Sequence, residues 1–224
     1  GFYNDRILLL LIITVVLIPI LTVFSFLFYP SSELWVHLRA TLIDDYIFNT
    51  IFITFFVSIF TVIIGVSSAW LVVMHRFPGK HIFKWLLVMP IAIPAYISAY
   101  IYAGLSEPSG FLFEFFDTNF NLGRELFHLI DIRNIYGSIF ILSISLYPYV
   151  YLLCYSSFRE QSYCALEVGK SLGLNDMDSF NRIGLPLARP AIVAGLSLVI
   201  METVAEFGTM DYYGVATFTT GIYR

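Results

Sequence analysis

Glu202 and Glu206 are the ionisable residues that interrupt an otherwise apolar stretch of the chain, residues 191–210. A spacing of four residues would place both carboxylates on one face of a helix. A bare carboxylate in lipid is costly, so the pair is expected to face the interior of a helix bundle or water. There the two could attract a cation on an outer pathway or form a gate. The structural alternative is that they are protonated, or bonded to Thr203, Thr209 or a neighbouring helix.

Tyrosines and prolines mark two further apolar stretches. Tyr96, Tyr100, Tyr151 and Tyr155 lie deep enough to need hydroxyl partners, and the first three are candidates for a substrate pathway. Tyrosines near helix ends are, however, commonly interfacial. Pro90 and Pro94 remove two backbone donors from one helix and should bend or break it. That break would be either a hinge or a packing kink.

The residue pattern does not predict an enzyme. No His-Glu-x-x-His site is present, and the four histidines lie outside the apolar stretches. The two cysteines have no metal-ligand spacing. We therefore expect no catalytic residue, no metal site and no nucleic-acid partner, while a channel or sensor remains an alternative class.

The composition is that of a polytopic membrane protein. Of 224 residues, 58% are hydrophobic and only 12% are charged. Uncharged runs of membrane-spanning length predict an all-α fold with transmembrane helices at residues 7–29, 49–74, 85–105, 135–158 and 191–210.

Lysine and arginine residues predict the orientation. With the N-terminus inside, the inner segments carry Arg6, Arg76, Lys80, Lys84, Arg159, Lys170, Arg182 and Arg189, and the outer segments carry Arg39, Arg124, Arg133 and Arg224. Inner segments of membrane proteins are enriched in these residues, so this excess predicts a cytoplasmic N-terminus. The polar interval at residues 159–189 then faces the cytoplasm.

That interval, which we call the coupling loop, predicts two short helices. Ser162 can cap the first, and Gly173 stands where a left-handed residue would end it. Asp176 can cap the second. Pro186 is expected to stop the second helix before the next span begins.

The coupling loop resembles the EAA loop of ATP-binding-cassette importer permeases of type I. The family pattern is Glu-Ala-Ala, three residues, Gly, nine residues and Ile-x-Leu-Pro, although here a valine and a glycine replace the two alanines. The resemblance implies that the first short helix docks in a groove of an ATPase subunit. The docking and junction residues it implies are Ala165, Leu166, Glu167, Gly169, Gly173, Ile183, Leu185 and Pro186.

Shorter stretches at residues 91–96, 147–151 and 206–224 are similar to the ferric-iron branch of these importers. Residues 1–48 are interpreted as a first transmembrane helix and outer loop. Residues 49–224, which the resemblance covers, form the permease core. The glycine at the start, and an end just after the fifth span, predict a fragment of a six-helix half.

The resemblance implies a permease that takes ferric iron from a periplasmic binding protein to the cytoplasm by alternating access. ATP and Mg²⁺ would be bound by a partner ATPase, in two copies, with no cofactor in this chain. It also implies a second permease half, in the same chain or a partner chain, and a multi-pass location in the bacterial inner membrane. A permease for thiamine, polyamine or sulfate is the main alternative, followed by an ATPase-independent channel.

Overall fold

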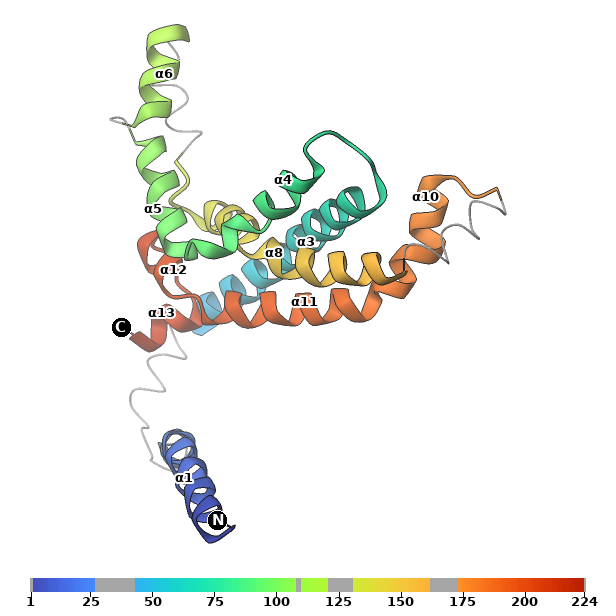
Figure 1. Cartoon of the computed structure of the whole chain (residues 1–224). Helices are drawn as coiled ribbons and strands as arrows, with labels where there is room; N and C mark the ends of the chain where they lie inside the picture. The colour runs from blue at the N-terminus through green and yellow to red at the C-terminus, as the bar shows by residue number, and fades with distance from the viewer. Residues whose placement is uncertain (1, 27–42, 108–109, 121–130, 162–172, 224) are drawn as a thin grey trace. The chain divides into compact units, whose positions relative to one another are not determined.

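The computed structural model describes residues 2–26, 43–107, 110–120, 131–161 and 173–223, and every regular element within them is a helix. The elements are α1 (Phe2–Phe26), α3 (Ile43–Met74), α4 (Lys80–Leu86), the 3₁₀ turn η1 (Met89–Ala92), α5 (Ala95–Ser106), α6 (Phe111–Phe120), α8 (Ile135–Gln161), α10 (Asp176–Ser179), the π turn η2 (Phe180–Gly184), α11 (Leu185–Ala205), α12 (Gly208–Tyr212) and α13 (Phe218–Tyr223) (Figure 1).

The chain divides into two compact units, residues 1–44 and 45–224. In the first unit, α1 contains an apolar stretch of 20 residues, Arg6–Ser25, with none of it buried. A helix that is apolar on every side and not buried by its own chain is suited to a lipid environment.

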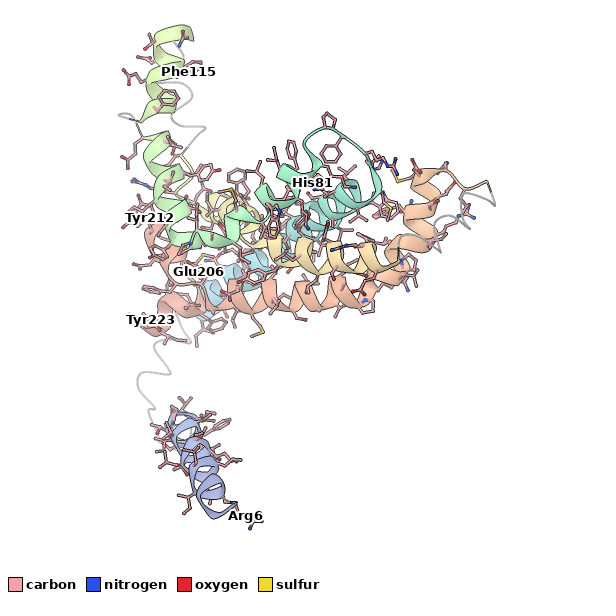
Figure 2. All side chains as sticks on the ribbon, in the orientation of Figure 1. Arg6, His81, Phe115, Glu206, Tyr212 and Tyr223 are labelled. Atoms are coloured by element: carbon pink, nitrogen blue, oxygen red, sulfur yellow. The ribbon has the colours of Figure 1, made fainter. Side chains whose placement is uncertain are left out.

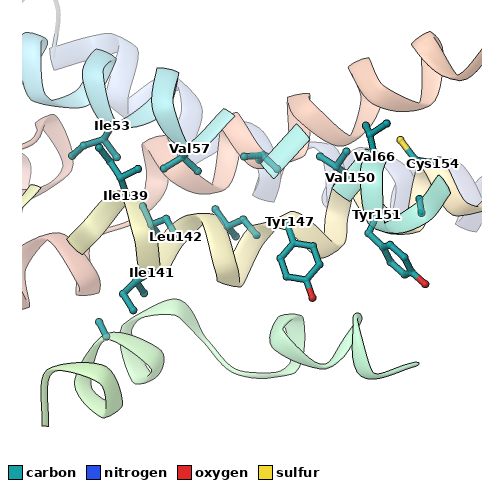
Figure 3. Close-up of a cluster of buried hydrophobic side chains, with 14 of the residues drawn as sticks. Ile53, Val57, Val66, Ile139, Ile141, Leu142, Tyr147, Val150, Tyr151 and Cys154 are labelled. Carbon is teal, nitrogen blue, oxygen red and sulfur yellow. The ribbon is translucent and has the colours of Figure 1, made fainter. Parts of the chain in front are cut away.

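Helix α8 is the centre of the second unit. Most of its apolar window is buried, and α11 packs along it. Figure 3 shows part of the core, where Val57 and Val66 of α3 lie with Leu142 and Val150 of α8.

Two glycines allow the helices to approach α8 closely. A Cβ on Gly65 of α3 would lie 2.8 Å from the Val150 Cβ, and a Cβ on Gly195 of α11 would lie 2.8 Å from the Val150 Cα. Val150 is fully buried between them. Small residues at crossing points let membrane helices make extensive van der Waals contact, which drives their association in lipid.

The predicted spans are present, with two changes. Four helices among the described residues are long and apolar enough to cross a membrane, and a bent pair would form a fifth. The span predicted at residues 85–105 is divided into α4, η1 and α5, with a bend of 96°. The span predicted at residues 191–210 ends earlier, at Ala205. The all-α membrane fold is confirmed.

Candidate functional site

Within the coupling loop the structure describes residues 159–161, at the end of α8, and residues 173–189; Gly173 has φ +83°. This is the left-handed conformation that the sequence predicts for a residue ending the first short helix. That helix, with Ala165, Leu166, Glu167 and Gly169, lies outside the described residues, so the docking role of these residues stays a prediction.

Residues 169–173 also read Gly-Lys-Ser-Leu-Gly, which is the spacing of a hydrolase nucleophile elbow. Such an elbow requires a strand before the serine and a helix after it. Ser171 and the residues immediately before it lie outside the described residues.

The second short helix is present, but its N-cap is Asn175. The Asn175 side chain accepts a hydrogen bond from the Asp178 backbone amide at 2.7 Å. Asn175 has the extended backbone of a capping residue, whereas Asp176 is already helical. The prediction of an Asp176 cap is wrong by one residue. Asp176 and Asp178 instead lie in the first turn, where their negative charges favour the helix dipole.

Pro186 does not end this helix. Residues Asp176–Ala205 form one continuous helical segment, and the Leu185 amide donates to the Phe180 carbonyl across the π turn η2. Proline interrupts an α-helix because it lacks an amide proton and crowds the carbonyl four residues earlier. The wider π turn immediately before Pro186 relaxes that crowding, so the predicted stop is wrong. The coupling loop is therefore joined rigidly to α11.

Trp70, near the end of α3, packs against both α8 and the coupling loop. Its ring lies 5.3 Å from the Phe158 ring of α8 and 4.9 Å from the Phe180 ring of η2, measured between centroids. A Cβ on Gly184 would lie 2.6 Å from an atom of the Trp70 ring, so the indole rests on the Gly184 backbone. We call Trp70, Phe158, Phe180 and Gly184 the Trp70 cluster.

The junction residues of the resemblance lie beside this cluster. Ile183 and Leu185 are partly buried and pack against the hydrophobic core. Pro186 is also partly buried, within the first turn of α11. Their positions fit a junction between the coupling loop and the bundle.

At the opposite end of α11, Glu206 has left the helix. Its backbone is extended (φ −70°, ψ 117°), and its Oε1 accepts a hydrogen bond from the Thr209 amide at 2.8 Å. Glu202 and Glu206 therefore do not share a helix face, because α11 ends between them. The Glu206 carboxylate stabilises the start of α12, which is the structural role left open by the sequence. Figure 2 labels Glu206 on the ribbon. Glu202 is exposed on α11.

The bend in the span near Pro94 packs against the place where α11 ends, at Glu206. Pro90 lies in η1 and Pro94 immediately precedes α5, so the two prolines lie at the 96° bend that they predict. Tyr96, just after the bend, lies against Gly208: a Cβ on Gly208 would be 2.8 Å from the Tyr96 Cβ. The Tyr213 hydroxyl also donates to the Ala99 carbonyl at 3.2 Å. Two interrupted spans are thus packed together through α5 and α12.

An aromatic and charged cluster extends from this junction. The Tyr100 and Tyr212 rings stack with centroids 3.9 Å apart, and the Arg133 guanidinium lies 5.5 Å from the Tyr212 ring centroid. Arg133 also forms an ion pair with Glu107 at the end of α5. Desolvation lowers the Arg133 pKa, but Tyr212 and Glu107 outweigh it, and the pKa lies above its ordinary value.

The tyrosines predicted for the pathway occupy different environments. Tyr151 is fully buried, and its hydroxyl donates to the Lys84 carbonyl at 3.2 Å, which joins α8 to α4. Tyr96 and Tyr100 are exposed to 46% and 57%. The structure brings Tyr96, Tyr100 and Glu206 to one junction, and Tyr151 and Glu202 are not among the contacts that form it. A pathway role for any of the five stays a prediction.

Sequence reasoning missed the Trp70 cluster and the contacts of Gly65 and Gly195 with α8. A tryptophan near the end of an apolar run is the signal expected of an interfacial residue, so it did not single out Trp70. Glycines within two different spans were a usable signal, because small residues mark helix–helix contacts in membranes.

Comparisons with known proteins assign the chain to a family. Residues 61–223 match the family described as "Binding-protein-dependent transport system inner membrane component". The sulfate transport system permease protein CysT of Salmonella typhimurium is 26% identical over 166 residues, covering 73% of this chain and 56% of CysT. The Fe(3+)-transport system permease protein FbpB 2 of Haemophilus influenzae is 27% identical over 176 residues, covering 79% of this chain and 30% of FbpB 2.

A probable molybdenum ABC transporter permease protein of Haloferax volcanii is 26% identical over 152 residues, covering 66% of this chain and 52% of that protein. The chain thus spans between about a third and just over half the length of these relatives. The family match covers the coupling loop, the Trp70 cluster and the junction of the two interrupted spans. The chain belongs to the inner-membrane components of binding-protein-dependent transport systems, the type I permeases of ATP-binding-cassette importers.

Proposed function

We propose that this chain is the membrane-spanning subunit of an ATP-driven importer whose coupling loop receives force from a cytoplasmic ATPase. The observation that carries the proposal is the set of motif anchors Glu167, Gly173, Ile183, Leu185 and Pro186 inside the matched family region. ATP and Mg²⁺ belong to the partner ATPase, of which two copies are proposed. A periplasmic binding protein supplies the substrate, and a second permease half completes the pathway.

The geometry of the described part of the loop supports this role. Met177 is 67% exposed and the Arg182 side chain 71% exposed, so this side of the segment is accessible to a partner. The other side contacts the core through Ile183 and Leu185. An element with one accessible side and one packed side is suited to pass a displacement from a partner to the bundle.

Alternating access requires spans that rearrange on ATP binding, and the two interrupted spans are suitable. Residues near Pro94 and Glu206 leave helical geometry, so backbone rotation there does not require an intact helix to break. We propose these two positions as hinges. Among the described residues, they separate α5 and α12 from the helices that continue toward the coupling loop.

The proposed substrate is a small inorganic ion, with ferric iron as the first candidate and sulfate as the second. Ferric iron is supported by the short stretches at residues 91–96, 147–151 and 206–224 and by the match to a ferric-iron permease. Sulfate is supported by the several sulfate permeases that match the chain. Ferric iron is a hard cation that favours oxygen ligands, whereas sulfate needs hydrogen-bond donors, so the two require different pathway chemistry.

Orientation can be tested with a membrane-impermeant thiol reagent. A cysteine at Met177, in a Cys164→Ser background, is expected to react only when the inner face of the membrane is open to the reagent. The remaining Cys154 is fully buried and should stay unlabelled. Labelling of the Met177→Cys variant from the outer face of sealed cells would refute a cytoplasmic coupling loop.

ATPase docking and substrate can be tested in one reconstituted system. Glu167→Lys is expected to reduce co-purification of the ATPase while membrane insertion is retained. Asp45→Lys, which makes the same charge change at an exposed position at the start of α3, is the matched control and should leave association unchanged. Equal retention of the ATPase by both variants would refute docking through Glu167.

For the substrate, ATP hydrolysis and uptake are measured with binding proteins loaded with ferric iron, sulfate, thiamine or polyamine. Stimulation and uptake with the iron-loaded protein alone would support the first candidate. The same response with sulfate alone would replace it by the second. Uptake without any ATPase would refute the importer function and favour a channel.

A further inference from the structure

We propose that Trp70 transmits movement of the coupling loop to α3 and α8, and is a positioning residue for the transport reaction. This inference rests on the proposed function, because it assigns a route for force that enters at the coupling loop. Of the cluster residues, only Phe180 and Gly184 lie within the motif, at positions that the motif leaves unspecified. The basis of the inference is the contact of one indole ring of α3 with two separate elements, α8 and η2.

The first step is the way the ring is held. Phe158 of α8 is 1% exposed and meets the Trp70 ring at an interplanar angle of 79°, an edge-to-face contact. Phe180 of η2 meets the same ring at 58°. Aromatic pairs at these separations and angles add specific, directional attraction to their buried area. The indole therefore cannot move independently of either neighbour without losing one of these contacts.

The second step is the backbone contact at Gly184. The position where a Cβ would stand is 2.6 Å from Cζ3 and 3.2 Å from Cη2 of Trp70, so only glycine admits the ring this closely. Gly184 is the last residue of the π turn, and π turns are frequent at functional sites. Phe180 and Gly184, at the two ends of that turn, both face the indole. A rigid backbone contact transmits displacement more directly than a contact between flexible side-chain ends.

The third step separates two routes for the force. The coupling loop is covalently continuous with α11 through the π turn, so α11 must follow any displacement of the loop. Helix α3 is not a chain neighbour of the loop and meets the π turn through the Trp70 cluster, and α8, which precedes the loop in the chain, contacts the same indole through Phe158. Removing the indole should leave the α11 route intact and weaken the packing route to α3 and α8. ATP hydrolysis would then continue while transport per ATP falls.

The experiment uses the complete complex of permease, ATPase and binding protein in liposomes. The variants are Trp70→Ala, Trp70→Phe and Gly184→Ala, and the matched control is Trp85→Ala, which removes a tryptophan that is 67% exposed on α4. Co-purification of the ATPase, basal ATP hydrolysis and substrate molecules transported per ATP are measured for each.

Trp70→Ala is expected to retain the ATPase and basal hydrolysis while transport per ATP falls about tenfold, within the usual range of coupling between distant sites. Trp70→Phe keeps an aromatic ring and should restore most of that coupling. Trp85→Ala should match the wild type. Gly184→Ala places a methyl group against the ring without truncating the core, and should show the same uncoupling if Trp70→Ala fails to fold.

The possible failures are distinguishable. Transport per ATP that is unchanged in both Trp70→Ala and Gly184→Ala, in a wild-type complex that works, would overturn this inference and leave the proposed function standing. Loss of ATPase binding in Trp70→Ala without loss in Trp85→Ala would also overturn it, because Trp70 would then support docking rather than transmission. A wild-type chain that retains no ATPase would overturn the proposed function itself.

Discussion

Substitution of Gly195 by alanine tests the close contact between α11 and α8. The added Cβ would lie 2.8 Å from the Val150 Cα and 3.3 Å from the Tyr149 carbonyl oxygen. The nearest atom belongs to backbone, so no side-chain rotation can relieve the overlap and the two helices must separate locally. Overpacking of this kind costs about 1–3 kcal/mol.

Gly104→Ala is the matched control, because Gly104 also lies inside a helix and its added Cβ would meet nothing within 4 Å. Both variants share the gain of about 1 kcal/mol for replacing helical glycine by alanine. Their difference therefore isolates the packing strain.

The assay is reversible unfolding of the purified chain in mixed micelles. The Gly195→Ala variant is expected to be less stable than Gly104→Ala by about 1–3 kcal/mol, or about 5- to 150-fold in the unfolding equilibrium. Equal stability of the two variants would refute the close approach of α11 to α8. Greater stability of Gly195→Ala would refute it as well.

The junction of the two interrupted spans offers a charge test, and the helix starts offer two capping tests. Glu107→Arg and Arg133→Glu should each lower the free energy of unfolding. The double reversal should recover up to about 1 kcal/mol of it, since both side chains are over 40% exposed and such pairs contribute little. If the two losses simply add in the double variant, the ion pair is contradicted. Glu206→Ala should cost about 0.5–2 kcal/mol by removing the α12 cap, and Glu206→Gln, which keeps an acceptor oxygen, should cost less. Equal losses would show that the charge, not the hydrogen bond to Thr209, is what matters. Asn175→Ala should cost a similar amount and speed hydrogen exchange at the start of α10, and unchanged exchange would exclude Asn175 as the cap.

The number and approximate position of the spans could be predicted because the lipid environment leaves little choice. A run of about 20 apolar residues can satisfy its backbone polar groups in a bilayer only as a helix. That local rule places α1, α3 and α8 close to where the sequence predicts them. It also predicts the interruption at Pro90 and Pro94, because a missing amide proton is a property of the residue itself.

The helix ends followed rules that the local pattern did not contain. Asn175 and Asp176 both have side chains that can cap a helix, so the sequence does not choose between them. In the structure the cap is Asn175. Pro186 stops an α-helix but not a helix widened by a π turn, and that turn coincides with the packing of Phe180 and Gly184 against Trp70. Glu206 leaves α11 and caps α12, which the spacing of two glutamates does not reveal.

By itself, the sequence determined that this chain is a bundle of apolar helices of the permease family, because apolar run length and motif spacing are read along one dimension. The tertiary structure decided which residues meet, including Trp70 with Gly184, Val150 with Gly65 and Gly195, and Tyr96 with Gly208. These contacts join residues that are far apart in the chain. They form only where two helix axes lie close together. Small residues permit that short distance, but the packing of the whole bundle sets it.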